Sequence, residues 1–116
     1  MKKQILIVLT ASASFLIAGA VQASGNGDAA KGKAVYEGTC IFCHGAKGTG
    51  EIPGTPNFTK ADGVLAQDDA VLIRHITDGF ESPGSAMPMP AKGGNPDLSD
   101  EDIENVLAYL HQAFGS

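Results

Sequence analysis

The chain has little of what usually builds a hydrophobic core. It contains no tryptophan and only 6% aromatic residues, while glycine occurs 15 times in 116 residues. No stretch shows the alternation of apolar and polar residues that predicts a half-buried β-strand. Because a small domain of this composition buries too little surface to be stable from its side chains alone, we expect a disulfide, a metal or a large cofactor to complete the core.

Basic residues are also scarce. Eight Lys and Arg stand against 13 Asp and Glu, which gives a net charge of −5. Two of the eight, Lys2 and Lys3, belong to the leader described next, and without them the net charge becomes −7. Such an acidic domain argues against binding to nucleic acid or to anionic membrane surfaces, and it favours partner proteins with basic docking patches.

Residues 1–23 have the order of a secretory signal peptide, with a basic start, an apolar stretch over 5–20 and small residues at the end. A retained membrane anchor is the alternative. The apolar stretch is shorter than the ~20 residues that span a bilayer, and three hydroxyl side chains interrupt it. We therefore expect cleavage after Ala23, no stable membrane insertion afterwards, and one exported domain over 24–116.

Helical patterns predict the first two helices. One begins at Asp28, a good N-cap, and continues to Cys40. Gly32 lies inside it at a cost of roughly 1 kcal/mol, which indicates that another backbone packs closely against this glycine. The second helix spans 68–79, where an aspartate starts it and Gly79 provides the expected stop.

The third helix has the clearest pattern. Ser99 is followed three residues later by Asp102, an acidic variant of the capping box. An apolar stripe then repeats at helical spacing, at Ile103, Val106, Leu107 and Leu110. Long segments rich in glycine and proline, 45–60 and 81–98, connect the helices. Since loops of this length are rare in a small domain, we expect them to wrap around something.

The only two cysteines lie in Cys-Ile-Phe-Cys-His, residues 40–44. A thioredoxin-like redox pair needs a βαβ pattern, which the chain lacks. Zinc needs four nitrogen or sulfur ligands, and no second ligand pair accompanies Cys40, Cys43 and His44. A structural disulfide would leave the adjacent histidine unexplained. C-x-x-C-H is typical of c-type haem attachment, in which two thiols add across two vinyl groups and the next imidazole faces the iron.

With these motifs the chain resembles the class I c-type cytochromes, in particular the short bacterial ones. The resemblance covers residues 27–114, and four segments carry it: the first helix, CxxCH, the run Met-Pro-Ala-Lys-Gly-Gly from Met89, and the last helix. It implies an all-α, cytochrome c-like fold of three to four helices wrapped around one covalently bound haem. It also implies that the terminal helices cross, with Gly32 lying under Tyr109.

The resemblance further implies the iron ligands. His44 would be the proximal ligand, and a methionine sulfur would bind on the other side. Met89 fits the family pattern Met-Pro-x-x-Gly-Gly, and Met87 is the alternative. A second histidine ligand, His75, is a weaker alternative, since we expect that side chain to lie in solvent.

Around the haem, the family places a proline carbonyl about a dozen residues after the proximal histidine, where it accepts the second imidazole N–H. Pro56 has this spacing from His44, with Pro53 as the rival, and Phe58 is the expected apolar haem neighbour. We interpret His111 as a cation near the C-terminal end of the helix dipole.

The implied function is electron transfer. One electron would be carried on the haem iron between redox partner proteins, with no enzymatic reaction, by a monomer in the bacterial periplasm. Two alternatives stay open: a haem subunit of a larger dehydrogenase or oxidase complex, and a ligand-binding sensor or peroxidase-like protein with an open sixth iron site. The segment Met-Pro-Ala-Lys-Gly-Gly argues against an open site.

Overall fold

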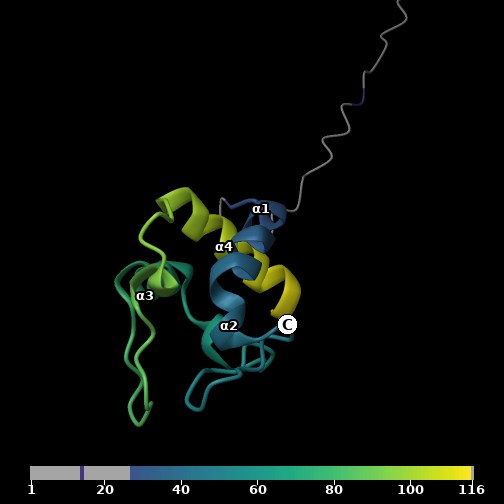
Figure 1. The fold of residues 1–116 in the computed structure, drawn as a ribbon. Helices are drawn as coiled ribbons and strands as arrows, with labels where there is room; N and C mark the ends of the chain where they lie inside the picture. Colours follow the sequence, from purple (N-terminus) through teal and green to yellow (C-terminus); the bar gives the residue numbers. More distant parts are fainter. Residues whose placement is uncertain (1–13, 15–26, 116) are drawn as a thin grey trace, which may run out of the picture.

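The computed structural model describes residue 14 and residues 27–115 (Figure 1). Apart from Ser14, the predicted signal peptide, residues 1–23, lies outside the described residues. The helices are α1 (Ala29–Val35), α2 (Ile41–His44), α3 (Asp69–Asp78) and α4 (Asp100–Phe114), with short helical segments η1 (Tyr36–Cys40), η2 (Val64–Ala66) and η3 (Ala91–Gly94). The fold is therefore all-α, as predicted. Within the described part of the chain, no helix is long and apolar enough to cross a membrane.

The first helical segment is longer than predicted. It begins where expected, since the Asp28 carboxylate accepts hydrogen bonds from the N–H groups of Ala30 and Lys31. It does not end at Cys40, because η1 is a π-helical stretch that joins α1 to α2 without a break. The helix stops at Gly45, where φ is +82°. Both cysteines and the histidine of CxxCH are thus held on helical backbone.

Helix α4 has the predicted start. The Ser99 hydroxyl accepts the N–H of Asp102, and the Asp102 carboxylate accepts the N–H of Ser99, which completes the capping box. The predicted apolar stripe is buried and forms much of the core. These contacts fix one long helix as the support for the rest of the fold.

Helices α1 and α4 cross in close contact (Figure 1). A Cβ on Gly32 would overlap the backbone carbonyl of Asn105, which confirms the expected close approach of a second backbone. The backbone of α4 lies directly against Gly32, and Tyr109 packs against Tyr36, with ring centroids 5.4 Å apart, while the expected contact of Tyr109 with Gly32 stays a prediction. The crossing is also pinned by the Asn105 side chain, whose oxygen accepts the N–H of Asp28 at 2.7 Å.

Helix α3 is attached to α4 at its start. The His111 ring contacts the Asp69 carboxylate at 2.8 Å between Nε2 and Oδ1, so His111 has a specific partner rather than only the helix dipole. At its other end, α3 stops at Gly79 as predicted, with φ +84°. The chain then forms an isolated antiparallel bridge between Phe80 and Met89, which the sequence pattern did not indicate.

Candidate functional site

A large cavity lies beside the α1–α4 crossing, with an empty volume of about 1320 Å³ that includes its open mouth. Its wall is mostly apolar and draws on the first helical segment, both long loops, α3 and α4. The residues that line it include Cys40, Cys43, His44, Pro56, Phe58, Met87 and Met89 of the predicted site, but not Pro53, the rival to Pro56. Segments far apart in the sequence therefore meet around one space, as expected for loops that wrap a large group.

The two cysteines lie on neighbouring helical turns at the cavity wall, and both thiols are free. Burial, with a smaller contribution from Cys43, raises the pKa of the Cys40 thiol to about 11. A reactive dithiol switch needs a lowered pKa, so this environment argues against one. Among residues 14 and 27–115, no group of three or more His, Cys, Asp or Glu side chains is placed to hold a metal as zinc would require.

His44 is buried, with 8% of its surface exposed. Burial lowers the pKa of its imidazole, which favours the neutral form that binds metals. Its ring stacks on Phe58 at a centroid distance of 4.5 Å. The Nδ1 atom is buried and has no hydrogen-bond partner among the described residues. The bond from His44 to the Pro56 carbonyl is thus not formed in this structure and stays a prediction, although Pro56 lines the same cavity.

The backbone after His44 is firmly held. The His44 carbonyl accepts the N–H of Gly50 at 2.9 Å, and the Cys43 carbonyl accepts that of Glu51 at 2.9 Å. The buried Tyr36 hydroxyl donates to the Gly45 carbonyl at 2.6 Å. Burial raises the pKa of the Tyr36 phenol, with smaller contributions from neighbouring side chains, so it stays a donor. The sequence showed Tyr36 four residues before Cys40 but gave no indication of this bond.

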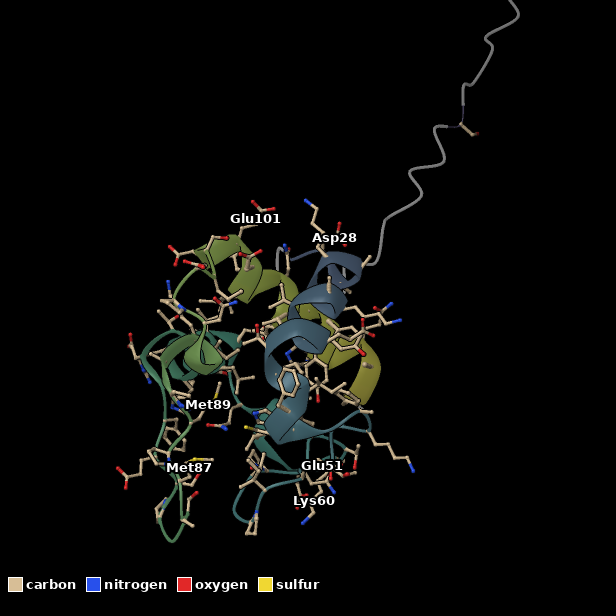
Figure 2. All side chains as sticks on the ribbon, viewed as in Figure 1. Asp28, Glu51, Lys60, Met87, Met89 and Glu101 are labelled. Atoms are coloured by element: carbon tan, nitrogen blue, oxygen red, sulfur yellow. The ribbon has the colours of Figure 1, made fainter. Side chains whose placement is uncertain are left out.

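The two methionines differ in how they are held. Met89 is partly buried, and its backbone exchanges two hydrogen bonds with Phe80, at 3.0 and 2.8 Å. Met87 is 52% exposed, and its carbonyl accepts only the Ser85 hydroxyl, at 2.8 Å. Figure 2 shows Met87 nearer the tip of the loop and Met89 nearer the body of the molecule. Met89 is therefore the better fixed of the two thioethers.

His75 does not lie in solvent as expected. It is partly buried, lines the cavity and stacks on Phe80 with ring centroids 4.1 Å apart. In the sequence His75 directly follows Arg74, which favoured a position in solvent. The contact with Phe80 depends on the turn at Gly79, which no local pattern of α3 reveals.

The donor groups around the cavity fit a c-type haem. Two thiols stand two residues apart on one helical wall, a neutral buried imidazole follows them, and thioether sulfurs lie on the segment 87–89. The buried Nδ1 without a partner is the nitrogen that would donate to the Pro56 carbonyl, which leaves the other ring nitrogen of His44 as the one that could bind iron. The helical fold and this set of thiol, imidazole and thioether groups together define a c-type cytochrome.

Comparison with known proteins agrees. The chain belongs to the family described as cytochrome c oxidase, cbb3-type, subunit III, which matches residues 27–110. It is 41% identical over 85 residues to cytochrome c-555 of Prosthecochloris aestuarii, covering 72% of this chain and 85% of that protein. It is 34% identical over 100 residues to cytochrome c-555 of Chlorobaculum tepidum, covering 82% and 88% of the two chains.

Among solved structures, cytochrome c6 of the diatom Phaeodactylum tricornutum superposes with a TM-score of 0.53 at 32% identity, covering 72% of this chain and 91% of that one. The protein is thus a small class I c-type cytochrome. It carries covalently bound haem c with its iron, transfers electrons and interacts with redox partners.

Proposed function

We propose that this protein is a periplasmic mono-haem electron carrier whose iron is bound by His44 and Met89, and that residues 1–23 are a signal peptide removed on export. The observation that carries the ligand assignment is the shared cavity. The buried imidazole of His44 and Met89, whose backbone is bridged to Phe80, both line it, together with the two thiols. The haem iron supplies the chemistry, a one-electron change between the ferrous and ferric states.

The protein's own residues hold and insulate the cofactor. Cys40 and Cys43 attach it by adding each S–H across a vinyl group, so that no leaving group is needed. His44 is kept neutral by burial and oriented by its stack on Phe58. The apolar wall excludes water from the iron, and burial of this kind tunes the reduction potential together with the axial ligands. We assign no enzymatic step to the chain.

Met89 is the proposed sixth ligand rather than Met87 for two reasons. Its backbone is fixed at both N–H and C=O by Phe80, and its side chain is less exposed. Met87 lies two residues away at a bend of the same loop, and its greater exposure suits a side chain at the edge of the cavity. We also propose that His75, although it lines the cavity, packs against the cofactor instead of binding iron.

Charge distribution suggests how a partner docks. The carboxylates of Asp28 and Glu101 lie at the end of the molecule opposite Met87 (Figure 2). Residues 52–59 and 82–91, several of which line the cavity, contain no charged side chain, and Lys92 is the only Lys, Arg, Asp or Glu among the lining residues. We propose that a monomer of net charge −7 attracts partners with basic docking patches at long range, and that contact itself is made through the nearly uncharged segments beside the cavity. Transfer rates with a basic partner should fall as salt rises, and a rate independent of ionic strength would refute the attraction.

Carbon monoxide binding tests the carrier assignment directly. The reduced parent protein and Met87→Ala should not bind carbon monoxide at neutral pH, because Met89 occupies the sixth position. Met89→Ala should bind it readily and serves as the positive control. If the parent bound carbon monoxide as well as Met89→Ala does, the sixth site would be open, and a ligand-binding sensor or peroxidase-like role would replace electron transfer.

A second candidate is supported by the family itself. Its description names a subunit of an oxidase, so a role as the haem subunit of a larger complex is compatible with the same site. Co-purification of the exported protein from its native membranes with an oxidase or dehydrogenase would favour this role. Recovery as a free monomer would favour the mobile carrier.

A further inference from the structure

The end of helix α3 makes an unusual approach to the segment that carries Met89. Gly79 has φ +84°, and a Cβ at this position would lie 2.7 Å from the Met89 carbonyl oxygen and 2.9 Å from the Ala91 nitrogen. Real Cβ atoms essentially never come so close to backbone atoms. Only glycine therefore lets the backbone of 89–91 lie directly against the last turn of α3.

Phe80 continues this contact. Its N–H donates to the Met89 carbonyl at 3.0 Å, and its carbonyl accepts the Met89 N–H at 2.8 Å. Its ring stacks on His75, which belongs to α3, with centroids 4.1 Å apart. The main chain of Met89 is thereby tied to α3 through one residue that is itself anchored on the helix.

Helix α3 in turn has a fixed position. The contact of 2.8 Å between Asp69 and His111 joins the first turn of α3 to α4. Helix α4 also packs against α1, which continues through η1 into the CxxCH segment. A continuous set of contacts thus runs from α4 through α3 to the backbone of Met89. On the other side of Met89, toward Met87, the described contacts are few and the chain is exposed.

We propose that Gly79 and Phe80 are positioning residues for the sixth iron ligand, and that they set how strongly the Met89 sulfur competes for the iron. The proposal rests on the assignment of Met89 as the ligand. If the backbone of Met89 already holds the side chain where its sulfur would bind iron, the side chain loses little conformational entropy on binding. The iron–sulfur bond would then resist displacement by other ligands. If Gly79 is enlarged, the segment 89–91 must move away from α3, and the sulfur is held less well.

The chain offers a matched control for this test. Gly84 has φ +79°, nearly the same as Gly79, but a Cβ there would meet nothing within 4 Å. Gly79→Ala and Gly84→Ala therefore introduce the same backbone strain, and only the first introduces a contact with the Met89 segment. Gly79→Asn provides a second variant, because Asn tolerates positive φ better than Ala while it still adds a Cβ.

The experiment titrates the ferric holoprotein with imidazole, which competes for the sixth position, and records the sulfur-to-iron absorption band and the reduction potential. For Gly79→Ala and Gly79→Asn we expect imidazole affinity to rise about tenfold, with a weaker band and a lower potential. Gly84→Ala should stay within about twofold of the parent in affinity. Thermal unfolding, measured in parallel, should show a larger loss for Gly79→Ala than for Gly84→Ala, because only Gly79→Ala adds a backbone clash to the strain of positive φ.

Two results would overturn the proposal in distinguishable ways. If Gly79→Ala and Gly84→Ala bind imidazole equally while Met89→Ala lacks the sulfur-to-iron band, Met89 is the ligand but α3 does not position it. If the band survives in Met89→Ala, the ligand assignment is wrong, and the positioning proposal fails with it.

Discussion

The two walls of the cavity are held in different ways. On one side, the segment of α1, η1 and α2 packs on α4, and side chains at that contact are almost fully buried: Tyr36 is 1% exposed and Ile103 0%, whereas Phe42 of α2 is 72% exposed. On the other side, the segment after α3 is exposed, with Phe80 at 43% and Met87 at 52%. Two backbone hydrogen bonds and one aromatic stack fix Met89 there.

This difference separates two tasks. The buried wall carries Cys40, Cys43 and His44, the proposed attachment and proximal-ligand residues, which must hold the same geometry in both oxidation states. The exposed wall carries the proposed second ligand, where small changes in backbone position alter bond strength. Stability should therefore respond mainly to changes in the first wall, and iron ligation mainly to changes in the second.

The largest expected effect is a loss of stability from a substitution in the buried wall. Gly32→Ala places a Cβ onto the Asn105 carbonyl of α4, so the helices must separate, at a cost of about 3 kcal/mol in the free energy of unfolding. Gly38→Ala is the control, since it lies in the same helical segment with nothing within 4 Å of its Cβ. That variant should be neutral or more stable by ~0.5–1 kcal/mol. Denaturant unfolding of the ferric holoprotein measures both, and equal effects would show that the crossing does not limit stability.

A smaller effect sharpens the same comparison. Tyr36→Phe removes the buried hydroxyl that donates to the Gly45 carbonyl, which we expect to cost about 1–2 kcal/mol. Tyr109→Phe also removes a tyrosine hydroxyl, but this one makes no hydrogen bond within the described residues. The free energy of unfolding should therefore fall by less than in Tyr36→Phe. Neither change should alter imidazole affinity at the iron. A Tyr36→Phe protein as stable as the parent, or one with weakened sulfur ligation, would contradict the division of tasks.

The smallest effect concerns pH and the start of α4. The Asp102 carboxylate accepts the backbone N–H of Ser99, and this bond, with contributions from the Ser99 side chain and Lys31, holds the pKa of Asp102 below the ordinary value of 3.8. Because the folded state has the lower pKa, this contribution to stability is complete above pH 3.8 and is lost as pH falls through the folded value.

Asp102→Asn should therefore unfold with a shallower dependence on pH than the parent below pH 3.8, and Ser99→Ala should flatten the same region of the curve. Thermal unfolding at a series of acid pH values measures this difference. Parallel curves for the parent and both variants would show that the capping box contributes nothing that depends on pH.

Features that depend only on residues close together in the sequence were predictable. The capping box at Ser99, the N-cap at Asp28 and the stop at Gly79 each need only a few neighbours in sequence, and all three are present in the structure. The close packing at Gly32 was predictable because a glycine inside a helix carries a cost that needs a reason. The cofactor was predictable from CxxCH, because covalent haem attachment requires two cysteines and a histidine at that spacing.

The remaining features depend on residues that are distant in sequence. The bridge between Phe80 and Met89, and the contact of Asp69 with His111, arise only when α3 is placed against other elements. The position of His75 at the cavity wall follows from the same placement. No local pattern distinguishes such pairs, whereas the hydrogen bond between His44 and Pro56 was expected from resemblance alone and stays a prediction.

The most direct test of the account is the proton NMR spectrum of the reduced, diamagnetic holoprotein. The methyl group of a methionine bound to haem iron lies over the porphyrin ring, whose ring current shifts its resonance far upfield. We expect one such three-proton signal in the parent, its persistence in Met87→Ala and its disappearance in Met89→Ala. An upfield methyl signal that disappears in Met87→Ala, or the lack of any such signal in the parent, would contradict ligation of the iron by Met89.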